Sequence, residues 1–217
     1  TYIIKNDLIN NYEIKKNKIR IIVNPYDFKE IYLKSNEVIK KDEKKLFKEP
    51  FILSVGRLNP QKNYEYLINI FRFVANNKKF KNFKLYILGE GREKQKLKEL
   101  IHKLGLNNHI YLLGFQKNPF KFMKKCKLFI LSSKYEGHSN VLVHSQILNN
   151  KILASKAFGA NKEVLANNGE IFANNKPHLI AIQAIKIMNK MKKNNNKDTL
   201  KNRFSDEKVV SKFNELF

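Results

Sequence analysis

The sequence has a single cysteine and no apolar run of membrane-spanning length. Cys126 cannot form a disulfide within the chain, which fits a reducing compartment, and its place before an apolar segment favours a buried thiol over a reactive one. No stretch approaches the roughly 20 apolar residues that a membrane helix needs. Lys5, Asp7 and Asn10 interrupt any apolar core of a signal peptide. These absences predict a soluble, cytoplasmic protein.

Acidic residues are also scarce. The chain has 19 Asp and Glu against 43 Lys and Arg in 217 residues, a formal net charge of +24. Such a protein is attracted to polyanions, which include nucleic acid, anionic membranes and phosphorylated ligands. The surplus comes with abundant Asn and Ile, a bias that AT-rich coding also produces, so the charge can equally be solvated surface. The length suits one domain with a full core.

Short apolar runs alternate with amphipathic segments from about residue 50 onward. The predicted strands are 51–55, 83–88, 110–113, 128–131, 151–155 and 169–172. The predicted helices are 63–77, 92–104, a short one after Pro119, 139–149 and 177–193. This order predicts an α/β fold: a Rossmann-like parallel sheet with right-handed crossovers and helices on both faces.

The two ends of the chain follow a different pattern. Residues 19–23 are predicted to form a strand and residues 24–27 a turn. Residues 29–48 are charged and poorly periodic, which predicts a linker with partial helix. Residues 190–202 predict a solvated helix end and loop, and 205–217 an amphipathic helix.

Glycines follow several of the predicted strands: Gly56, Gly89, Gly91 and Gly114. In open α/β sheets, ligands bind at the carboxyl ends of the strands. A glycine there lets the backbone approach a ligand, although it also simply lets the chain turn. Four such positions together indicate a nucleotide-type site.

Glu136 lies between a predicted strand and a helix that begins after Ser139. A carboxylate there can accept hydrogen bonds from two vicinal sugar hydroxyls. The alternative is that it complements the helix dipole, an effect of about 0.3–1 kcal/mol. The backbone amides of about Asn140 to Leu142 are expected to meet phosphate oxygens.

Two cations follow the first strand of the predicted sheet. Arg57 can hold a phosphate through two parallel hydrogen bonds, and Lys62 supplies a compact point charge. Fixed cations stabilise the negative charge that develops on a diphosphate leaving group. In a Lys-rich protein, both residues can instead be ordinary surface cations.

Three segments carry a resemblance to a known family: Ser54–Asn63, Leu112–Phe115 and Ser132–Leu142. The chain resembles the C-terminal, donor-binding half of retaining glycosyltransferases with the two-domain GT-B architecture, of the glycosyltransferase family 4 type. Weaker likeness at Asn24–Asp27 and in two later segments extends this resemblance over nearly the whole chain. These later segments are Gly159–Glu163 and Arg203–Phe217.

The resemblance implies a domain organisation. Residues 1–48 would end an N-terminal region and form the interdomain linker, 49–202 would bind the nucleotide sugar, and 203–217 would form the closing helix. Thr1 is interpreted as the middle of a longer chain. The acceptor-binding N-terminal domain is then expected in cis or in trans, because transfer needs a closed cleft.

The resemblance also implies residue roles. Arg57 and Lys62 would hold the donor diphosphate, and Glu136 would hold the sugar hydroxyls. These three residues are the expected catalytic residues. The residues implied to line the nucleotide sugar are Gly56, Gly89, Phe115, Gln116, Gly137, Asn140, Val141 and Leu142. The donor is expected to be UDP-linked, with no metal or other cofactor. The histidines, at 102, 109, 138, 144 and 178, show no metal-ligand spacing.

His144 departs from the family pattern, because the family usually has a second glutamate here that binds ribose hydroxyls. A neutral imidazole offers one acceptor nitrogen, whereas a carboxylate offers two oxygens. His144 is therefore either a substitute ribose ligand or an ordinary helix residue, and a glutamate in its place should tighten nucleotide binding.

The favoured function is transfer of a sugar from a nucleoside-diphosphate donor to a glycan or lipid-linked acceptor in surface-glycan synthesis. The basic charge could hold the protein on the anionic inner leaflet of a membrane. One alternative is a nucleic-acid-binding module, because residues 78–84 and 117–125 interleave aromatic and basic residues. Helical and strand spacing with one buried face explains these segments better, so no nucleic acid is expected. A truncated, inactive remnant is the third hypothesis.

Overall fold

The computed structural model describes residues 1–41, 43–173, 176–191 and 197–215. Its centre is a six-stranded sheet in the order β3-β2-β1-β4-β5-β6, and every strand pair is parallel. The strands are β1 (Phe51–Val55), β2 (Lys84–Leu88), β3 (Ile110–Gly114), β4 (Leu128–Leu131), β5 (Ile152–Ser155) and β6 (Glu170–Phe172). The predicted Rossmann-like α/β fold is confirmed.

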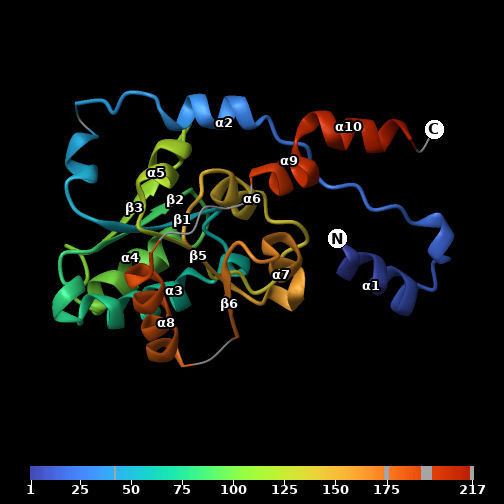
Figure 1. Ribbon diagram of the computed structural model, residues 1–217. Helices are drawn as coiled ribbons and strands as arrows, with labels where there is room; N and C mark the ends of the chain where they lie inside the picture. Colours follow the sequence, from blue (N-terminus) through green and yellow to red (C-terminus); the bar gives the residue numbers. More distant parts are fainter. Residues whose placement is uncertain (42, 174–175, 192–196, 216–217) are drawn as a thin grey trace.

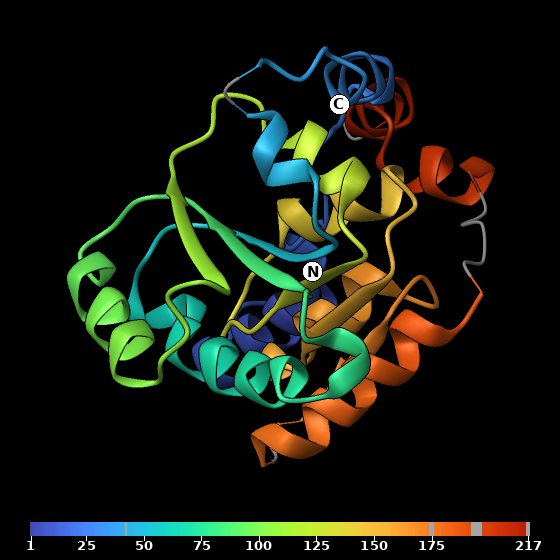
Figure 2. The same ribbon diagram turned by 90° about the vertical axis from the view of Figure 1, so that its left-hand side faces the viewer.

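Helices cover both faces of the sheet (Figures 1 and 2). One layer contains α3 (Tyr64–Ala75), α4 (Lys94–Lys103) and α8 (Pro177–Asn189). The other contains α2 (Phe28–Ser35), α5 (Phe120–Lys125), α6 (Asn140–Ile147), α7 (Ala160–Leu165) and α9 (Lys197–Phe204). Successive strand residues point to opposite faces, so Ile52 packs in the first layer and Leu53 in the second.

Five 3₁₀ helices and two terminal α-helices complete the described chain. They are α1 (Tyr2–Tyr12), η1 (Lys16–Lys18), η2 (Lys44–Phe47), η3 (Pro60–Lys62), η4 (Lys78–Phe80), η5 (Ala157–Gly159) and α10 (Asp206–Asn214). Figure 1 places α1 beside α7, outside the two helical layers. The partial helix predicted within 29–48 is confirmed by α2 and η2.

Two predictions about the ends of the chain are wrong, and one helix was not predicted. Residues 19–23 are extended but pair with no strand of the described sheet. The helix α1 was not predicted, because its sequence has no apolar face that signals it. Helix α9 replaces the second half of the loop predicted at 190–202, since Leu200 and Phe204, one helical turn apart, are buried.

The amphipathic helix predicted over 205–217 is confirmed by α10, whereas the first two residues of the closing segment belong to α9. Arg203 and Phe204 end α9, and α10 begins after Ser205, whose side chain accepts a hydrogen bond from the Lys208 amide. Residues 216–217 of the predicted closing helix lie outside the described residues. The predicted domain boundaries at 48 and 202 stay predictions.

The strand order reverses between β1 and β4. Connections from these two adjacent strands run to opposite faces of the sheet, which opens a crevice at their carboxyl ends. The sequence segments that follow β1 and β4 are the same two that carry Lys62 and Glu136.

Candidate functional site

Lys62 and Glu136 form an ion pair across the β1–β4 junction. The Lys62 Nζ lies 2.5 Å from the Glu136 Oε1, although the residues are 74 positions apart. Their side chains are only 15% and 7% exposed. Lys62 ends the short helix η3, whose first turn is capped because the Asn59 side chain accepts from the Lys62 amide. The hypothesis that Lys62 is an ordinary surface cation is therefore wrong.

The loops after β1 and β4 are joined by several further hydrogen bonds. The Lys134 amide donates to the Gln61 carbonyl at 2.8 Å, and the Gln61 side chain donates to the Tyr135 carbonyl at 3.0 Å. The Ser132 hydroxyl donates to the Lys62 carbonyl at 2.8 Å. The two loops thus form one surface that fixes the ion pair.

Gly56 and Gly89 allow a close backbone approach beneath this surface. A Cβ on Gly89, at φ +139°, would lie 2.0 Å from the Gly56 carbonyl oxygen. A Cβ on Gly56 would lie 3.1 Å from the Lys62 Cε, so the lysine side chain passes directly over that glycine. Gly89 is required by this close approach, whereas a Cβ on Gly56 would need only the Lys62 and Tyr64 side chains to shift.

Arg57 follows Gly56 and is exposed. Within the described part of the chain its guanidinium has no hydrogen-bond or ion-pair partner. The site therefore combines a buried, paired ammonium with a free guanidinium on the same loop. Its five donors remain available for an anion.

The start of α6 provides free backbone donors. Ser139 is the N-cap residue as predicted, but its hydroxyl is buried and has no partner among the described residues. The first amides of a helix have no intrahelical acceptor, and none in the described chain reaches those of Asn140 and Val141. The Leu142 amide instead donates to the Ser139 carbonyl at 3.1 Å, and the Leu142 side chain is buried. Two amides, rather than the three expected, are free.

The residues expected near the base lie at the ends of β2 and β3. The Gly89 amide donates to the Gly114 carbonyl at 2.8 Å, which brings these strand ends together. The Phe115 ring is 76% exposed and can stack on a planar base. The Gln116 side chain donates to the Leu113 carbonyl at 2.8 Å, so its amide nitrogen faces its own strand. Gly137 is exposed on the loop before α6.

His144 lies between two aromatic rings. The centroid of its imidazole is 5.3 Å from that of Tyr26 and 5.0 Å from that of Phe120, both edge-on. Burial lowers the pKa of His144 from 6.5 to about 4. The imidazole is therefore neutral near pH 7. Both interpretations of His144 stay open.

The lowered pKa of His144 predicts a loss of stability in mild acid. In the unfolded chain His144 becomes protonated below pH 6.5, whereas in the folded protein its imidazole stays neutral down to about pH 4. The contribution of neutral His144 to the free energy of unfolding is thus fully present above pH 6.5 and decreases toward pH 4. The decrease is about 2 kcal/mol between pH 7 and pH 5. Urea unfolding at both pH values checks this. His144→Phe, which keeps a ring, should remove most of the loss, whereas the exposed His178→Phe should not. Equal losses in all three proteins would contradict the assignment.

The N-terminal segment contacts the site in ways the sequence did not reveal. The Tyr2 amide lies 2.9 Å from each carboxylate oxygen of Glu163, so Glu163 caps the start of α1. A Cβ on Gly137 would lie 3.3 Å from the Ile4 side chain, which places α1 over the loop before α6. No sequence pattern links these residues, since they are more than 100 positions apart.

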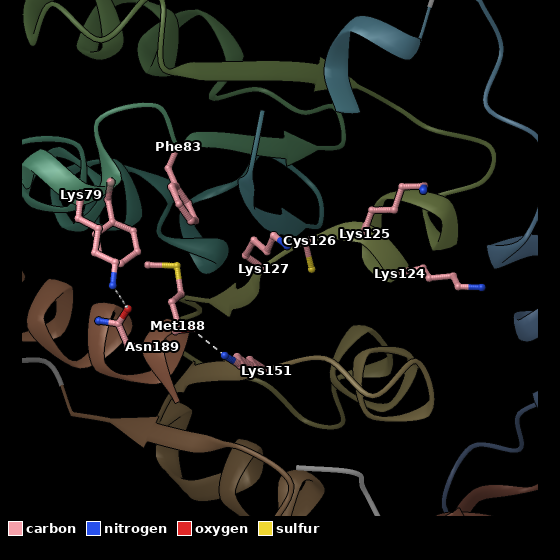
Figure 3. A pocket seen from close by; sticks show the side chains of 10 residues that line it. Lys79, Phe83, Lys124, Lys125, Cys126, Lys127, Lys151, Met188 and Asn189 are labelled. Atoms are coloured by element: carbon pink, nitrogen blue, oxygen red, sulfur yellow. Dashed lines mark hydrogen bonds between the residues drawn. The ribbon is translucent and has the colours of Figure 1, made fainter. Parts of the chain in front are cut away.

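A cavity of about 530 Å³ lies at the opposite, amino-terminal edge of the sheet (Figure 3). Lys79 in this cavity donates to the Asn189 side chain at 3.0 Å, and Lys151 donates to the Met188 carbonyl at 2.8 Å. Both lysines therefore bind groups at the carboxyl end of α8. The cavity contains none of the predicted site residues.

Two of the four phenylalanines in the two basic segments lie in the core, and Phe83 and Phe120 are partly buried against it. Phe80 and Phe122 are 4% and 0% exposed, so the interpretation with one buried face is confirmed for both segments. The exposed stacking rings that motivated the nucleic-acid hypothesis are absent at these two positions.

Two kinds of feature are absent from the described residues. No group of three or more His, Cys, Asp or Glu in this part of the chain is arranged to hold a metal ion. None of the helices formed by these residues has the length and apolar character required to cross a membrane.

The chain matches proteins from several organisms. An uncharacterised glycosyltransferase of Methanocaldococcus jannaschii is 40% identical over 156 residues, covering 71% of this chain and 38% of that protein. The N-acetylgalactosamine-N,N'-diacetylbacillosaminyl-diphospho-undecaprenol 4-alpha-N-acetylgalactosaminyltransferase of Campylobacter jejuni is 41% identical over 139 residues, 64% of this chain and 35% of that protein. The chain thus spans less than two-fifths of the length of either relative.

Solved structures share the fold. A glycosyltransferase from Rickettsia africae superposes with a TM-score of 0.81 at 20% identity, covering 100% of this chain and 61% of that one. HepE of Anabaena, in complex with UDP and glucose, also gives 0.81 at 20% identity, covering 98% and 60%. The sheet is therefore one half of a GT-B type structure. The model of the family "Glycosyl transferases group 1" matches residues 35–199, and the chain belongs to this family.

Proposed function

We propose that the chain is the donor-binding half of a retaining glycosyltransferase. The reaction is transfer of a sugar from a nucleoside-diphosphate sugar to a glycan or lipid-linked acceptor. The observation that carries this proposal is the buried Lys62–Glu136 pair at the strand-order reversal, beside the free guanidinium of Arg57. Membership of the glycosyltransferase family supports it.

The two cations suit the diphosphate. The Lys62 ammonium has three N–H donors and gives one of them to Glu136, so two remain for a phosphate oxygen. Arg57 adds a bidentate donor on the same loop. As the bond between the sugar and the diphosphate breaks, negative charge accumulates on the leaving group. Cations already fixed near that group stabilise the transition state.

Glu136 suits the sugar. Its Oε1 accepts from Lys62, and its second oxygen has no hydrogen-bond partner in the described part of the chain and can accept from a sugar hydroxyl. The free amides of Asn140 and Val141 follow Glu136 in the same segment after β4, and a phosphate oxygen can accept from them. Sugar and phosphate are thus recognised by one continuous loop.

The base and the cofactor requirement are also proposals. Phe115 and the strand ends at Gly89 would border the base, and UDP is supported by its presence in the HepE structure. We propose transfer without a metal ion or other cofactor, with Arg57 and Lys62 supplying the positive charge at the diphosphate.

The acceptor belongs to the remainder of the enzyme. Because the chain spans less than two-fifths of the two curated relatives named above, we propose that an N-terminal acceptor-binding domain, in cis or in trans, completes the cleft. The name of the Campylobacter relative supports a lipid-linked acceptor. A cytoplasmic location and contact with an anionic membrane stay proposals, to which the exposed Lys125 and Lys127 could contribute.

Calorimetric titration with UDP tests the proposal. The wild-type chain should bind saturably, and Arg57→Ala should weaken binding about tenfold or more, because one charge-assisted contact is lost. Arg72→Ala, an exposed arginine at the end of α3, is the matched control and should bind as the wild type does. Absence of saturable binding, or equal loss in both variants, would contradict the proposal.

A further inference from the structure

A chain of hydrogen bonds joins the N-terminal linker turn to the first residue of α6. The Tyr26 hydroxyl donates to the Asn140 Oδ1 at 2.7 Å, and the Asn24 side-chain amide donates to the same oxygen at 2.8 Å. The His138 Nε2 lies 3.1 Å from the Tyr26 hydroxyl oxygen. The tyrosine proton is directed to Asn140, so the Tyr26 oxygen can only accept from His138. The His138 Nε2 must therefore carry the proton of this bond. All donors in this chain therefore point toward Asn140.

Tyr26 is itself firmly held. Its side chain is buried, and its amide donates to the Phe204 carbonyl at 2.9 Å. Its own carbonyl accepts from the Asp206 amide at 3.3 Å, at the junction of α9 and α10. The ring packs edge-on against Phe204 and His144. The backbone of Tyr26 is thus held by the closing helices, while its ring also packs on His144 of α6.

Asn140 occupies a position from which it can orient the site. It is the first residue of α6, and the Ser139 side chain before it forms no capping bond. The usual side-chain cap of the helix start is therefore missing. The two bonds to the Asn140 side chain restrain this turn instead. The free amides of Asn140 and Val141 belong to the same turn.

We propose that Tyr26 and Asn24 are positioning residues that hold the first turn of α6, so that its two free amides stay directed at the donor diphosphate. This inference rests on the proposed function. It assigns the linker turn a part in donor binding without contact with the donor. A displacement of the linker, which leads into the preceding region of the chain, would be transmitted to the diphosphate site through Asn140.

Two tyrosine-to-phenylalanine variants test the proposal in the 217-residue chain. Tyr26→Phe removes the hydroxyl at the start of α6. Tyr32→Phe removes a hydroxyl that donates to the Ile147 carbonyl at 2.8 Å, at the other end of the same helix. Both keep the ring. Tyr26→Phe loses the hydroxyl's bonds to Asn140 and His138, and Tyr32→Phe loses the bond to the Ile147 carbonyl. The dissociation constant for UDP should rise about tenfold in Tyr26→Phe and less than about twofold in Tyr32→Phe, whereas the two melting temperatures should fall similarly.

The outcomes are distinguishable. If the wild type binds UDP and Tyr26→Phe binds it equally well, or if both variants weaken binding to the same extent, the positioning role is wrong and the proposed function stands. If the wild type does not bind UDP, both fail. Should Tyr26→Phe not fold, Asn24→Ala removes the second donor to Asn140 while Tyr26 remains. Weakened UDP binding would then support the proposal, and unchanged binding would overturn it.

Discussion

Lys62→Ala is expected to destabilise the protein and to abolish most donor binding. The substitution leaves the Glu136 carboxylate, only 7% exposed, without its partner. Breaking a pair this buried costs about 3 kcal/mol, because the remaining charge is poorly solvated. The dissociation constant for UDP should rise about 100-fold, since a charge-assisted contact is lost and the loop that holds Arg57 is loosened. Urea unfolding and calorimetry measure the two effects.

An exposed ion pair of the same length is the matched control. The Lys96 Nζ also lies 2.5 Å from a carboxylate oxygen, that of Glu65, but these side chains are 63% and 42% exposed. Lys96→Ala should leave stability and UDP binding nearly unchanged, because water screens the pair. In the double variant Lys62→Ala/Glu136→Ala, stability should partly recover while binding stays lost. Equal behaviour of Lys62→Ala and Lys96→Ala would contradict the buried role of the pair.

Gly89→Ala is expected to cost about 4 kcal/mol and to abolish UDP binding. The added Cβ would lie 2.0 Å from the Gly56 carbonyl oxygen, and the φ of +139° disfavours any side chain. Both backbone segments would have to separate, which moves the loop with Arg57 and Lys62. Thermal unfolding and a UDP titration record the two losses.

Gly105→Ala is the control for Gly89→Ala, because it introduces backbone strain without a steric clash. Gly105 also has a positive φ, of +67°, but no atom lies within 4 Å of its added Cβ. The variant should lose about 1 kcal/mol and bind UDP as the wild type does. A Gly89→Ala protein that is no less stable than Gly105→Ala would show that the close approach of β1 and β2 is not required.

The sheet could be predicted because its strands are apolar on both faces. Runs such as 51–55 and 128–131, each followed by Gly or Ser, match parallel strands buried between two helical layers. Helix α3 could be predicted for a similar reason, since Leu67, Phe71 and Val74 recur at helical spacing and are buried. Helix α1 has no such pattern, and its start depends on Glu163, a residue far along the chain.

The candidate site was predicted in part. Strand-end position placed Lys62 and Glu136 at one edge of the sheet, but neither the ion pair nor its burial follows from local sequence. The contacts of Tyr26 and Asn24 with Asn140 could not be predicted at all, because the path of residues 24–26 beside α6 depends on the packing of α9 and α10. Local pattern defines elements, whereas long-range packing decides which side chains meet.

The most direct test of the central claim is a crystal structure of the chain with UDP. The β-phosphate should lie within hydrogen-bond distance of the Arg57 guanidinium and the Lys62 ammonium, at the carboxyl ends of β1 and β4. Density for UDP in the lysine-lined cavity at the opposite edge of the sheet, with the Lys62–Glu136 loop empty, would contradict it.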